Sequence, residues 1–430
     1  MSQRIFVPRG GGNLVNVNFG HSLAFINDNI LAAATDGSVP GAGVHIFFKT
    51  ISDVAYDHYQ TIFGDQQNLI NNKFGYSLAT SKNTNTLVVG APARNTTAKV
   101  DCVQQWCGLC SWSTTDSTLC EDRLDRIVES SNGDEDVIKQ QIMTSGRCEG
   151  EEICTEIVST GKVYVYEPTG SEWERVSIIT SDDPSFGSVV AMDEGVIAIG
   201  SPDEDKVTVY EEEENGRSWT LLESKTSPTK GARFGASLSL SGGTLVVGAP
   251  LDGIGGVVYV YAKSARGFVP RGQPLAPRDI QRGDNFGEKV SVSGCTVAVS
   301  SSNAITASTT STGSVRIFNY DPDLDLYSAD QIVEPTEEVA GVFPDCVVME
   351  GNNLLIGSSS GSSSGLLTHF VRRNHGSWTQ KSVIRNPQAG AFGCGLSISE
   401  SKALVGAKGT EQGSAGSFYV AELCAGDELI

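Results

Sequence analysis

Two stretches of the chain are nearly copies of each other. The sequence KFGYSLATSKNTNTLVVGAP occupies residues 73–92, and RFGASLSLSGGTLVVGAP occupies residues 233–250. Both open on Phe-Gly, alternate apolar with small residues, turn on small polar residues and close on Gly-Ala-Pro. Since a phrase that recurs at a nearly constant period indicates repeated architecture, weaker copies decide how many units the chain contains.

Phe-Gly opens a similar phrase at six places, and a degenerate Phe343-Pro344 fills the gap between the last two of them. The intervals are roughly 50 residues, and the one long interval that remains becomes regular when residues 98–158 are set aside as an insertion. Seven units result. The six pairs are Phe19-Gly20, Phe74-Gly75, Phe186-Gly187, Phe234-Gly235, Phe286-Gly287 and Phe392-Gly393.

These motifs are interpreted as structural. Glycine after Phe lets the backbones of two consecutive units approach each other closely at their junction. Gly-Ala-Pro ends a strand with residues that are too small to clash with the neighbouring unit. The Phe ring then fills the space that the small residues leave.

Each unit predicts four short strands, because apolar or alternating runs are bounded by turn residues. In the unit at Phe234, strands are expected at residues 236–240, 244–247 and 256–261. A fourth strand begins at an aromatic residue shortly before the next unit; these residues are Tyr59, Trp173, Trp219, Phe268, Tyr327 and Trp378.

The last unit has no fourth strand of its own. The N-terminal run Phe6–Arg9 (FVPR) is identical to residues 268–271, which form the outer strand ahead of the fifth unit. If Phe6–Arg9 completes the last sheet, the ring closes and leaves no open end of sheets. The predicted fold is therefore all-β, a seven-bladed β-propeller of four-stranded blades.

The ordered recurrence of these motifs resembles the FG-GAP repeat, which is found in the head of integrin alpha subunits and in many extracellular proteins. The resemblance covers nearly all of the chain except residues 98–158. It implies that the links between strands two and three, and between blades, share an upper face that meets ligands. The family's calcium loops between strands one and two are replaced here by short links at 26–29, 193–194 and 241–243, so bound calcium is not implied there and no cofactor is expected.

Composition narrows the classes of partner. The 430 residues carry a formal net charge of -20, which argues against nucleic acid because its phosphates would be repelled. No apolar run approaches the length that spans a membrane. The N-terminus lacks the pattern of a signal peptide, so we expect either a mature or excised form or a protein that stays inside the cell.

The insertion at 98–158 divides the propeller into residues 1–97 and 159–430. It lies in the link between strands two and three of blade 2. Its six cysteines predict a disulfide framework and hence an extracellular or cell-surface protein. Two apolar periodic segments around residues 124–128 and 137–142 predict a helical hairpin. The sequon at Asn95 would carry a glycan. The cysteines are Cys102, Cys107, Cys110, Cys120, Cys148 and Cys154.

Two other interpretations of these cysteines remain open. Their spacing could hold zinc, although the insertion has no His, and WCGLC at 106–110 looks like a thioredoxin-type redox centre without its βαβ context. No pairing or redox state follows from the sequence for the other four cysteines, Cys295, Cys346, Cys394 and Cys424.

Candidate catalytic groups are few, and no enzyme is predicted. The five histidines, His21, His45, His58, His369 and His375, show no metal-ligand spacing, and His45 and His369 are interpreted as strand residues. The GxSxG matches at 357–361 and 361–365 fall in a Ser/Gly loop that lacks the strand-to-helix elbow of a nucleophile. Asp321, Asp323 and Asp325 are weak metal candidates, because the turn Gly and a later acidic ligand are missing.

The predicted function is recognition or adhesion, in which the ring holds loops that bind a protein or glycan. The alternatives are a self-associating building block of an extracellular coat or filament and, less favoured, a carbohydrate-active or thiol-redox enzyme. Aromatic anchors are enriched where partners bind, which favours the insertion and the acidic link beside it. The predicted binding residues are Trp106, Trp112, Asp203, Glu204, Asp205 and Asp252.

Overall fold

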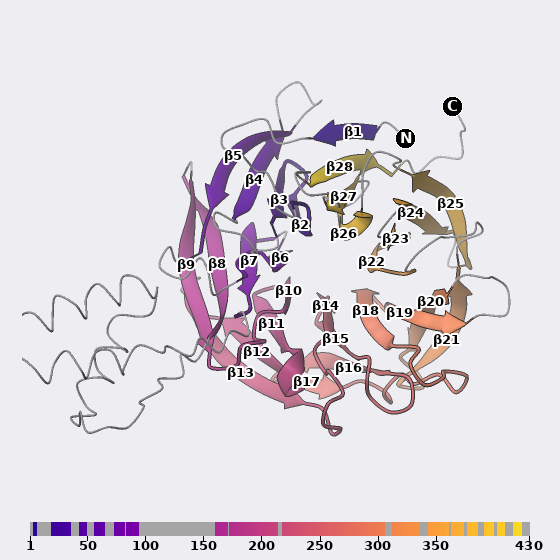
Figure 1. The fold of residues 1–430 in the computed structure, drawn as a ribbon. Coiled ribbons are helices and arrows are strands. Elements are labelled where there is room, and N and C mark those ends of the chain that lie inside the picture. Colours follow the sequence, from indigo (N-terminus) through magenta and orange to yellow (C-terminus); the bar gives the residue numbers. More distant parts are fainter. Residues whose placement is uncertain are drawn as a thin grey trace, which may run out of the picture.

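The computed structural model is a ring of seven four-stranded antiparallel sheets, all within the residues that it describes (Figure 1). Those residues are 3–6, 19–35, 43–49, 56–64, 73–81, 83–93, 160–170, 172–213, 217–305, 312–334, 343–360, 363–373, 376–385, 391–399, 402–408 and 416–423. The predicted seven-bladed propeller is therefore confirmed. The predicted insertion and its boundaries at 98 and 158 lie outside the described residues.

Six of the blades are built from four strands in chain order, with the first strand nearest the axis of the ring (Figure 1). Blade 1 holds β2(Ser22–Asn27), β3(Ile30–Ala34), β4(Val44–Lys49) and β5(Tyr56–Ile62); blade 2 holds β6(Ser77–Ser81), β7(Thr86–Ala91), β8(Gly161–Thr169) and β9(Glu172–Ser181); blade 3 holds β10(Val189–Asp193), β11(Val196–Ser201), β12(Lys206–Glu212) and β13(Trp219–Thr226).

Blades 4 to 6 follow the same order, and blade 7 takes its outermost strand, β1, from the N-terminus. Blade 4 holds β14(Ser237–Ser241), β15(Thr244–Ala249), β16(Val257–Ser264) and β17(Gly267–Pro270); blade 5 holds β18(Phe286–Ser293), β19(Thr296–Ile305), β20(Thr312–Asp321) and β21(Leu326–Val333); blade 6 holds β22(Cys346–Glu350), β23(Asn353–Ser360), β24(Ser363–Arg372) and β25(Trp378–Arg385); blade 7 holds β26(Ala391–Ser399), β27(Lys402–Lys408), β28(Ser417–Glu422) and β1(Gln3–Phe6).

The N-terminal strand closes the ring, as predicted. β1 pairs antiparallel with β28, and Ile5 stands opposite Tyr419 in the register. Figure 1 shows β1 beside β28 at the outside of blade 7. The strand lies at Gln3–Phe6 rather than at the predicted Phe6–Arg9, and residues 7–9 lie outside the described residues.

Contact between backbones explains the Phe-Gly and Gly-Ala-Pro motifs. Gly287 has φ +92°, a conformation that L side chains rarely adopt. Its carbonyl oxygen accepts a hydrogen bond of 2.7 Å from the hydroxyl of Ser237 in blade 4. A Cβ atom added to Gly248 would lie 2.0 Å from the same oxygen. Neighbouring blades therefore meet backbone to backbone at this position, which we call the hub.

The hub contact recurs around the ring. Equivalent pairs are Gly90 with Gly187, Gly200 with Gly235, Gly357 with Gly393 and Gly406 with Gly20, and in each the added Cβ would lie within 2.4 Å of the partner's carbonyl oxygen. The Phe rings of all seven units are buried beside it. Seven apolar clusters, each shared by two neighbouring blades, continue the contact outward among the described residues.

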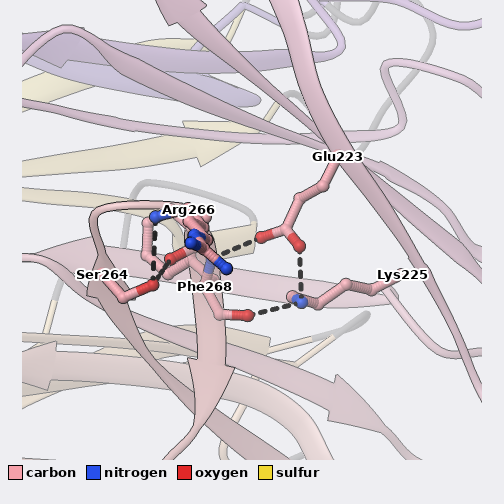
Figure 2. A network of polar contacts seen from close by, with 6 residues as sticks. Glu223, Lys225, Ser264, Arg266 and Phe268 are labelled. Carbon is pink, nitrogen blue, oxygen red and sulfur yellow. Dashed lines mark hydrogen bonds and ion pairs between the residues drawn. The ribbon is translucent and has the colours of Figure 1, made fainter.

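The outer rim uses polar clamps instead. The amide of Gln60 on β5 accepts the Trp173 backbone N–H at 2.8 Å and donates to the Trp173 carbonyl at 3.1 Å. Gln331 on β21 holds the backbone of Trp378 in the same way, at 2.7 and 2.8 Å. Between blades 3 and 4, two side chains make the two hydrogen bonds that one Gln makes elsewhere. Glu223 accepts from the Phe268 N–H, and Lys225 donates to the Phe268 carbonyl (Figure 2).

One predicted strand start is wrong. Tyr59 does not begin the fourth strand of blade 1; it is the extra residue of a β-bulge in β5 and is 46% exposed. Tyr56 begins the strand and is buried. The bulge turns the side chain of Tyr59 outward, and similar bulges interrupt the outer strands β9, β13, β21 and β25. Bulges hinder an edge strand from pairing with another chain.

The links between first and second strands are tight turns that also join blades. β2 ends at Asn27 and β3 begins at Ile30, which leaves no room for carboxylates at alternate positions. The Gly242 N–H donates to Asp193 of the preceding blade at 2.7 Å. These turns, like those between third and fourth strands, lie at the lower end of the blades, opposite the links from second to third strands.

No helix in the described part of the chain is long and apolar enough to cross a membrane.

Candidate partner-binding surface

The upper ends of blades 3 and 4 are the part of the predicted binding face that the structure describes most fully. Four links meet there: 202–205 and 250–256, between second and third strands, and 227–236 and 271–285, which lead into the next blades. The corresponding links at 36–42, 94–159, 306–311, 361–362 and 409–415 lie outside the described residues.

Asp205 is built into this surface rather than displayed on it. The residue has φ +51° at the end of the short 3-10 helix η2(Pro202–Glu204), and it is buried. Its carboxylate accepts the backbone N–H groups of Gly231 and Phe234, and its carbonyl accepts the Ser227 N–H at 3.1 Å. A buried carboxylate needs such donors, so the geometry shows Asp205 joining blade 3 to the segment that enters blade 4.

Asp203 and Glu204 differ from Asp205 although they adjoin it in the chain. Both are exposed in the first turn of η2. Because Asp205 fixes the end of this turn, the two acidic side chains project from a rigid support. Of the three predicted acidic residues in this link, these two are exposed and available to a partner.

Asp252 is also occupied within the molecule. It is buried and accepts the hydroxyl of Tyr259 at 2.6 Å, while its backbone carbonyl accepts the Gly256 N–H at 2.9 Å. Burial raises the pKa of Tyr259, and the hydrogen bond to the Asp252 carboxylate raises it further. The Tyr259 proton is therefore held between the two groups, and Asp252 shapes its loop instead of facing solvent.

The same loop exposes two large aliphatic side chains that are not among the binding residues predicted from the sequence. Leu251 is 54% exposed, and Ile254 is 73% exposed, the highest value among the large hydrophobic side chains that the structure describes. The Leu251 N–H donates to the Ala232 carbonyl at 3.1 Å, and a Cβ on Gly255 would lie 2.2 Å from the Gln281 carbonyl oxygen. The loop tip is thus fixed against links on both sides.

The Asp321, Asp323 and Asp325 turn has a structural explanation. Asp321 accepts the backbone N–H groups of Asp323 at 2.9 Å and Leu324 at 3.3 Å, and Asp325 accepts the Tyr320 hydroxyl at 2.8 Å. The turn is exposed between β20 and β21, at the lower end of blade 5. No group of three or more His, Cys, Asp or Glu side chains that could hold a metal occurs within the described ranges.

Several predicted features lie outside the described residues. These are Trp106, Trp112, the six insertion cysteines, the helical hairpin and the sequon at Asn95, all of which stay predictions. Cys424 and the side chain of Cys394 also fall outside the description. Cys295 is exposed in the turn between β18 and β19, and Cys346 begins β22 half-buried.

The aliphatic pair left a faint signal in the sequence. The link Leu251–Gly255 reads LDGIG, and it places two large apolar residues within four positions of Pro250. Turn residues are usually small or polar, so apolar residues on both sides of Asp-Gly are unusual for an exposed link. The burial of Asp205 and Asp252 had no such signal, because their partners are backbone groups and a Tyr on the next strand.

Comparison with known proteins agrees with the fold. Residues 228–261 match the FG-GAP repeat family model. A crystal structure of a protein from Lactobacillus plantarum superposes with a TM-score of 0.52 at 12% identity, covering 91% of this chain and 99% of that one. At this identity the similarity shows the fold alone. No curated protein matches the chain in sequence.

Two other solved structures are similar over much of their length. One is a proposed 6-phosphogluconolactonase from Bacteroides fragilis, with a TM-score of 0.49 and 12% identity, covering 85% of this chain and 84% of that one. The other is Saccharomyces cerevisiae Sqt1, with a TM-score of 0.46 and 10% identity, covering 95% and 97%. Both TM-scores are too low to support an argument about function.

Proposed function

Since the chain is a seven-bladed β-propeller that carries an FG-GAP repeat in blade 4, we propose that it is a recognition module whose upper face binds another protein. The proposal rests on one observation, the exposure of Leu251 and Ile254 on a loop that hydrogen bonds and close packing hold in place. Fold alone does not decide function, so the argument depends on this surface.

A fixed apolar tip favours binding for a physical reason. Burying Leu251 and Ile254 against a partner removes apolar area from water, at roughly 25 cal/mol per Å². A loop already held by Asp252, Gly255 and Ala232 loses little conformational freedom on binding, so more of that gain remains as affinity. A flexible loop with the same residues would bind more weakly.

The chemistry of the surface favours a protein over a glycan. Aliphatic side chains gain most from apolar side chains of a partner, whereas a sugar presents mainly hydroxyl groups. The exposed Asp203 and Glu204 on η2 would complement basic residues at the rim of the contact. A partner with an apolar anchor next to Lys or Arg fits both features.

An assembly built by edge-to-edge strand pairing is less favoured. The outer strands β5, β9, β13, β21 and β25 carry bulges, and β1 and β17 are only four residues long. Both devices discourage strand addition at the rim. Self-association would have to use the upper or lower face, so a second copy of the chain is one outcome of the test below.

The proposed setting is outside the cell or at its surface. This part of the proposal rests on the six clustered cysteines of the insertion and on the Asn95 sequon. In the same proposal the insertion extends the binding face with Trp106 and Trp112. Binding is proposed in preference to catalysis because the exposed features on the described upper face are apolar and acidic side chains on fixed loops.

The test compares wild-type protein with a double variant of the loop and with one control variant. Wild-type protein is first applied to protein and glycan arrays, and its self-association is measured by sedimentation velocity. The Leu251→Ser, Ile254→Ser double variant should lose the protein binding that wild type shows. The control is Leu221→Ser on β13, since Leu221 is 58% exposed at the outer rim and pairs with Tyr210, away from the β12 end that follows the link at 202–205. Binding only to glycans, or equal binding by the double variant, would overturn the proposal.

A further inference from the structure

The upper loop at 251–255 lies between two links that carry exposed cations. On one side it contacts the link 227–236 through Leu251, and on the other it contacts the link 271–285 through Gly255. Each link contributes two cations, and none of these four forms an ion pair within the described part of the chain. The four are Lys230, Arg233, Arg278 and Arg282. The aliphatic tip of the loop is therefore flanked by positive charge on both sides.

These cations are unusual in so acidic a molecule. The chain has a formal net charge of -20, yet residues 228–236 contain two of the cations and no Asp or Glu. Both acids of the other link are already bound within the molecule. Asp279 pairs with Arg316 at 2.8 Å, and Asp284 accepts the backbone N–H of Gln281 at 2.8 Å. The positive charge beside the loop is thus not neutralised by its own links.

Arg233 has a backbone conformation that its side chain does not favour. Its φ is +55°, and Asn285, at the matching place before the Phe of the next unit, has φ +56°. Asn tolerates the left-handed conformation better than Arg does. The backbone therefore gives no reason for an Arg at this place, whereas a negatively charged partner gives one.

A turn at the opposite end of the ring has the complementary character. Residues 321–326 read DPDLDL and join β20 to β21 at the lower end of blade 5. Leu324 is 65% exposed, and Asp323 and Asp325 on either side of it are also exposed. The Asp321 carboxylate fixes the turn, because it accepts the backbone N–H groups of Asp323 and Leu324. The turn therefore presents an apolar side chain between carboxylates.

The two surfaces match in polarity and in charge. Burying Leu324 against Leu251 and Ile254 would remove apolar area from water on both sides. Around that contact, the cations of the upper links would face the carboxylates of the lower turn, which also fixes the orientation of the contact. Because the surfaces lie at opposite ends of the ring, they cannot meet within one molecule. Two copies can bring them together.

We propose that the upper loop at 251–255 binds the lower turn at 321–326 of a second copy of this chain. The proposal rests on the proposed function, because it uses the same loop, and it names the partner. Each copy contributes two different surfaces, so the contact is heterologous and repeats head to tail in a closed ring of copies or an open row. The exposed Arg266, on the lower turn of blade 4, gives the lower end a cation that complements Asp203 and Glu204.

The net charge of the chain opposes this association only at long range. At physiological ionic strength the Debye length is about 8 Å, so the acids elsewhere on two approaching copies are largely screened from each other. Charges that touch across an interface are screened much less. Contacts between the cations and the carboxylates therefore decide the outcome at this ionic strength.

The experiment measures self-association by sedimentation velocity at about 0.15 M salt and up to about 100 μM protein, where an interface with a Kd of about 1–10 μM is largely occupied. The sedimentation coefficient of wild-type protein should rise with concentration. The upper variant, Arg278→Glu with Arg282→Glu, and the lower variant, Asp323→Lys with Leu324→Ser, should each associate at least about tenfold more weakly. Leu221→Ser at the outer rim should associate like wild type.

Mixing the variants tests the head-to-tail arrangement itself. The lower variant keeps its upper surface and the upper variant keeps its lower turn, so together they should form a one-to-one complex that grows no further. The matched control mixes the upper variant with the Leu251→Ser, Ile254→Ser variant. Both of these lack a working upper surface, and their mixture should stay monomeric.

The proposal is overturned if wild-type protein stays monomeric, if the upper or the lower variant associates like wild type, or if the mixture of the two stays monomeric. The proposed function fails by a different result, in which the Leu251→Ser, Ile254→Ser variant keeps the protein binding that wild type shows. Monomeric wild-type protein that loses a partner from the protein array on this double substitution would refute a second copy as the partner and support the proposed function.

Discussion

The hub and the upper surface of the ring follow opposite rules. At the hub, glycine meets carbonyl in one blade pair after another, and the chemistry hardly varies from Gly90–Gly187 to Gly406–Gly20. On the upper surface, the links at 202–205 and 250–256 share neither sequence nor shape. Contacts that repeat hold the ring together, and links that do not repeat are free to acquire a partner.

The rim shows an intermediate case. The clamps at Gln60, Gln331 and the Glu223–Lys225 pair do the same work with different side chains. Their targets are backbone groups, which are present whatever residue stands there. A contact of this kind can be made by different side chains in different blades, so the geometry repeats around the rim although the residues do not.

Removing the closing strand should have the largest effect on stability. Deleting residues 1–6 takes β1 away from β28 and leaves an unpaired edge on blade 7. We expect a loss of about 4 kcal/mol or more and a tendency to aggregate, as for the severe mechanisms of destabilisation. Thermal unfolding measures this, with deletion of residues 1–2 alone as the control. Equal melting temperatures would mean that β1 does not close the ring.

A single methyl group at the hub should come next. In Gly248→Ala the new Cβ would lie 2.0 Å from the Gly287 carbonyl oxygen, so blades 4 and 5 must separate. Overpacking of this kind costs about 3 kcal/mol. Gly170→Ala is the comparison, because nothing lies within 4 Å of its added Cβ and its cost is only the backbone strain of an L side chain at φ +65°, about 1–2 kcal/mol. Urea unfolding compares them, and a similar loss in both variants would contradict a special role for the hub.

On the upper surface, two neighbouring acids should behave differently. Asp205→Asn leaves one oxygen to serve the N–H groups of Gly231 and Phe234, and we expect a loss of roughly 1.5–3 kcal/mol, the range for hydrogen bonds to charged groups. Asp203→Asn changes only an exposed side chain and should stay within about 0.5 kcal/mol of wild type. If both variants unfold at the same urea concentration, Asp205 does not fix the link.

The rim should give the smallest effect, and one that can be reversed. Lys225→Met removes the ammonium that donates to the Phe268 carbonyl and that also contacts the Glu223 carboxylate and the Tyr261 ring. Because the group lies at the partly exposed rim, the loss should cost about 1 kcal/mol. Adding Glu223→Gln supplies an amide like that of Gln331 and should restore most of the loss. A double variant no more stable than Lys225→Met would show that the two kinds of clamp are not equivalent.

The sequence predicted what repeats. Phe234-Gly235 and its copies, the strand alternation and the closing strand were all readable, because each reflects a local demand on backbone shape or side-chain size. Tyr59 was misplaced because an aromatic residue three positions earlier, Tyr56, fills the buried place and a bulge turns Tyr59 outward. A bulge shifts the side-chain alternation by one residue and leaves little trace in composition.

The candidate sites were harder to predict because they depend on contacts across the fold. Asp205 and Asp252 were expected on the surface, yet the structure turns both carboxylates toward internal donors. Leu251 and Ile254 were passed over because isolated apolar residues in a link look ordinary until their exposure is known. Asp205, for example, is held by backbone N–H groups 26 and 29 positions further along the chain.

The central claim is that the upper links over blades 3 and 4 bind the partner while the structure of the ring stays unchanged. Hydrogen–deuterium exchange, measured by mass spectrometry with and without a protein partner found on the arrays, tests it most directly. The account predicts that binding slows exchange in residues 202–205 and 250–256, with little change in the lower turns at 194–195 and 242–243. Protection confined to the lower turns or to the outer strands would contradict it.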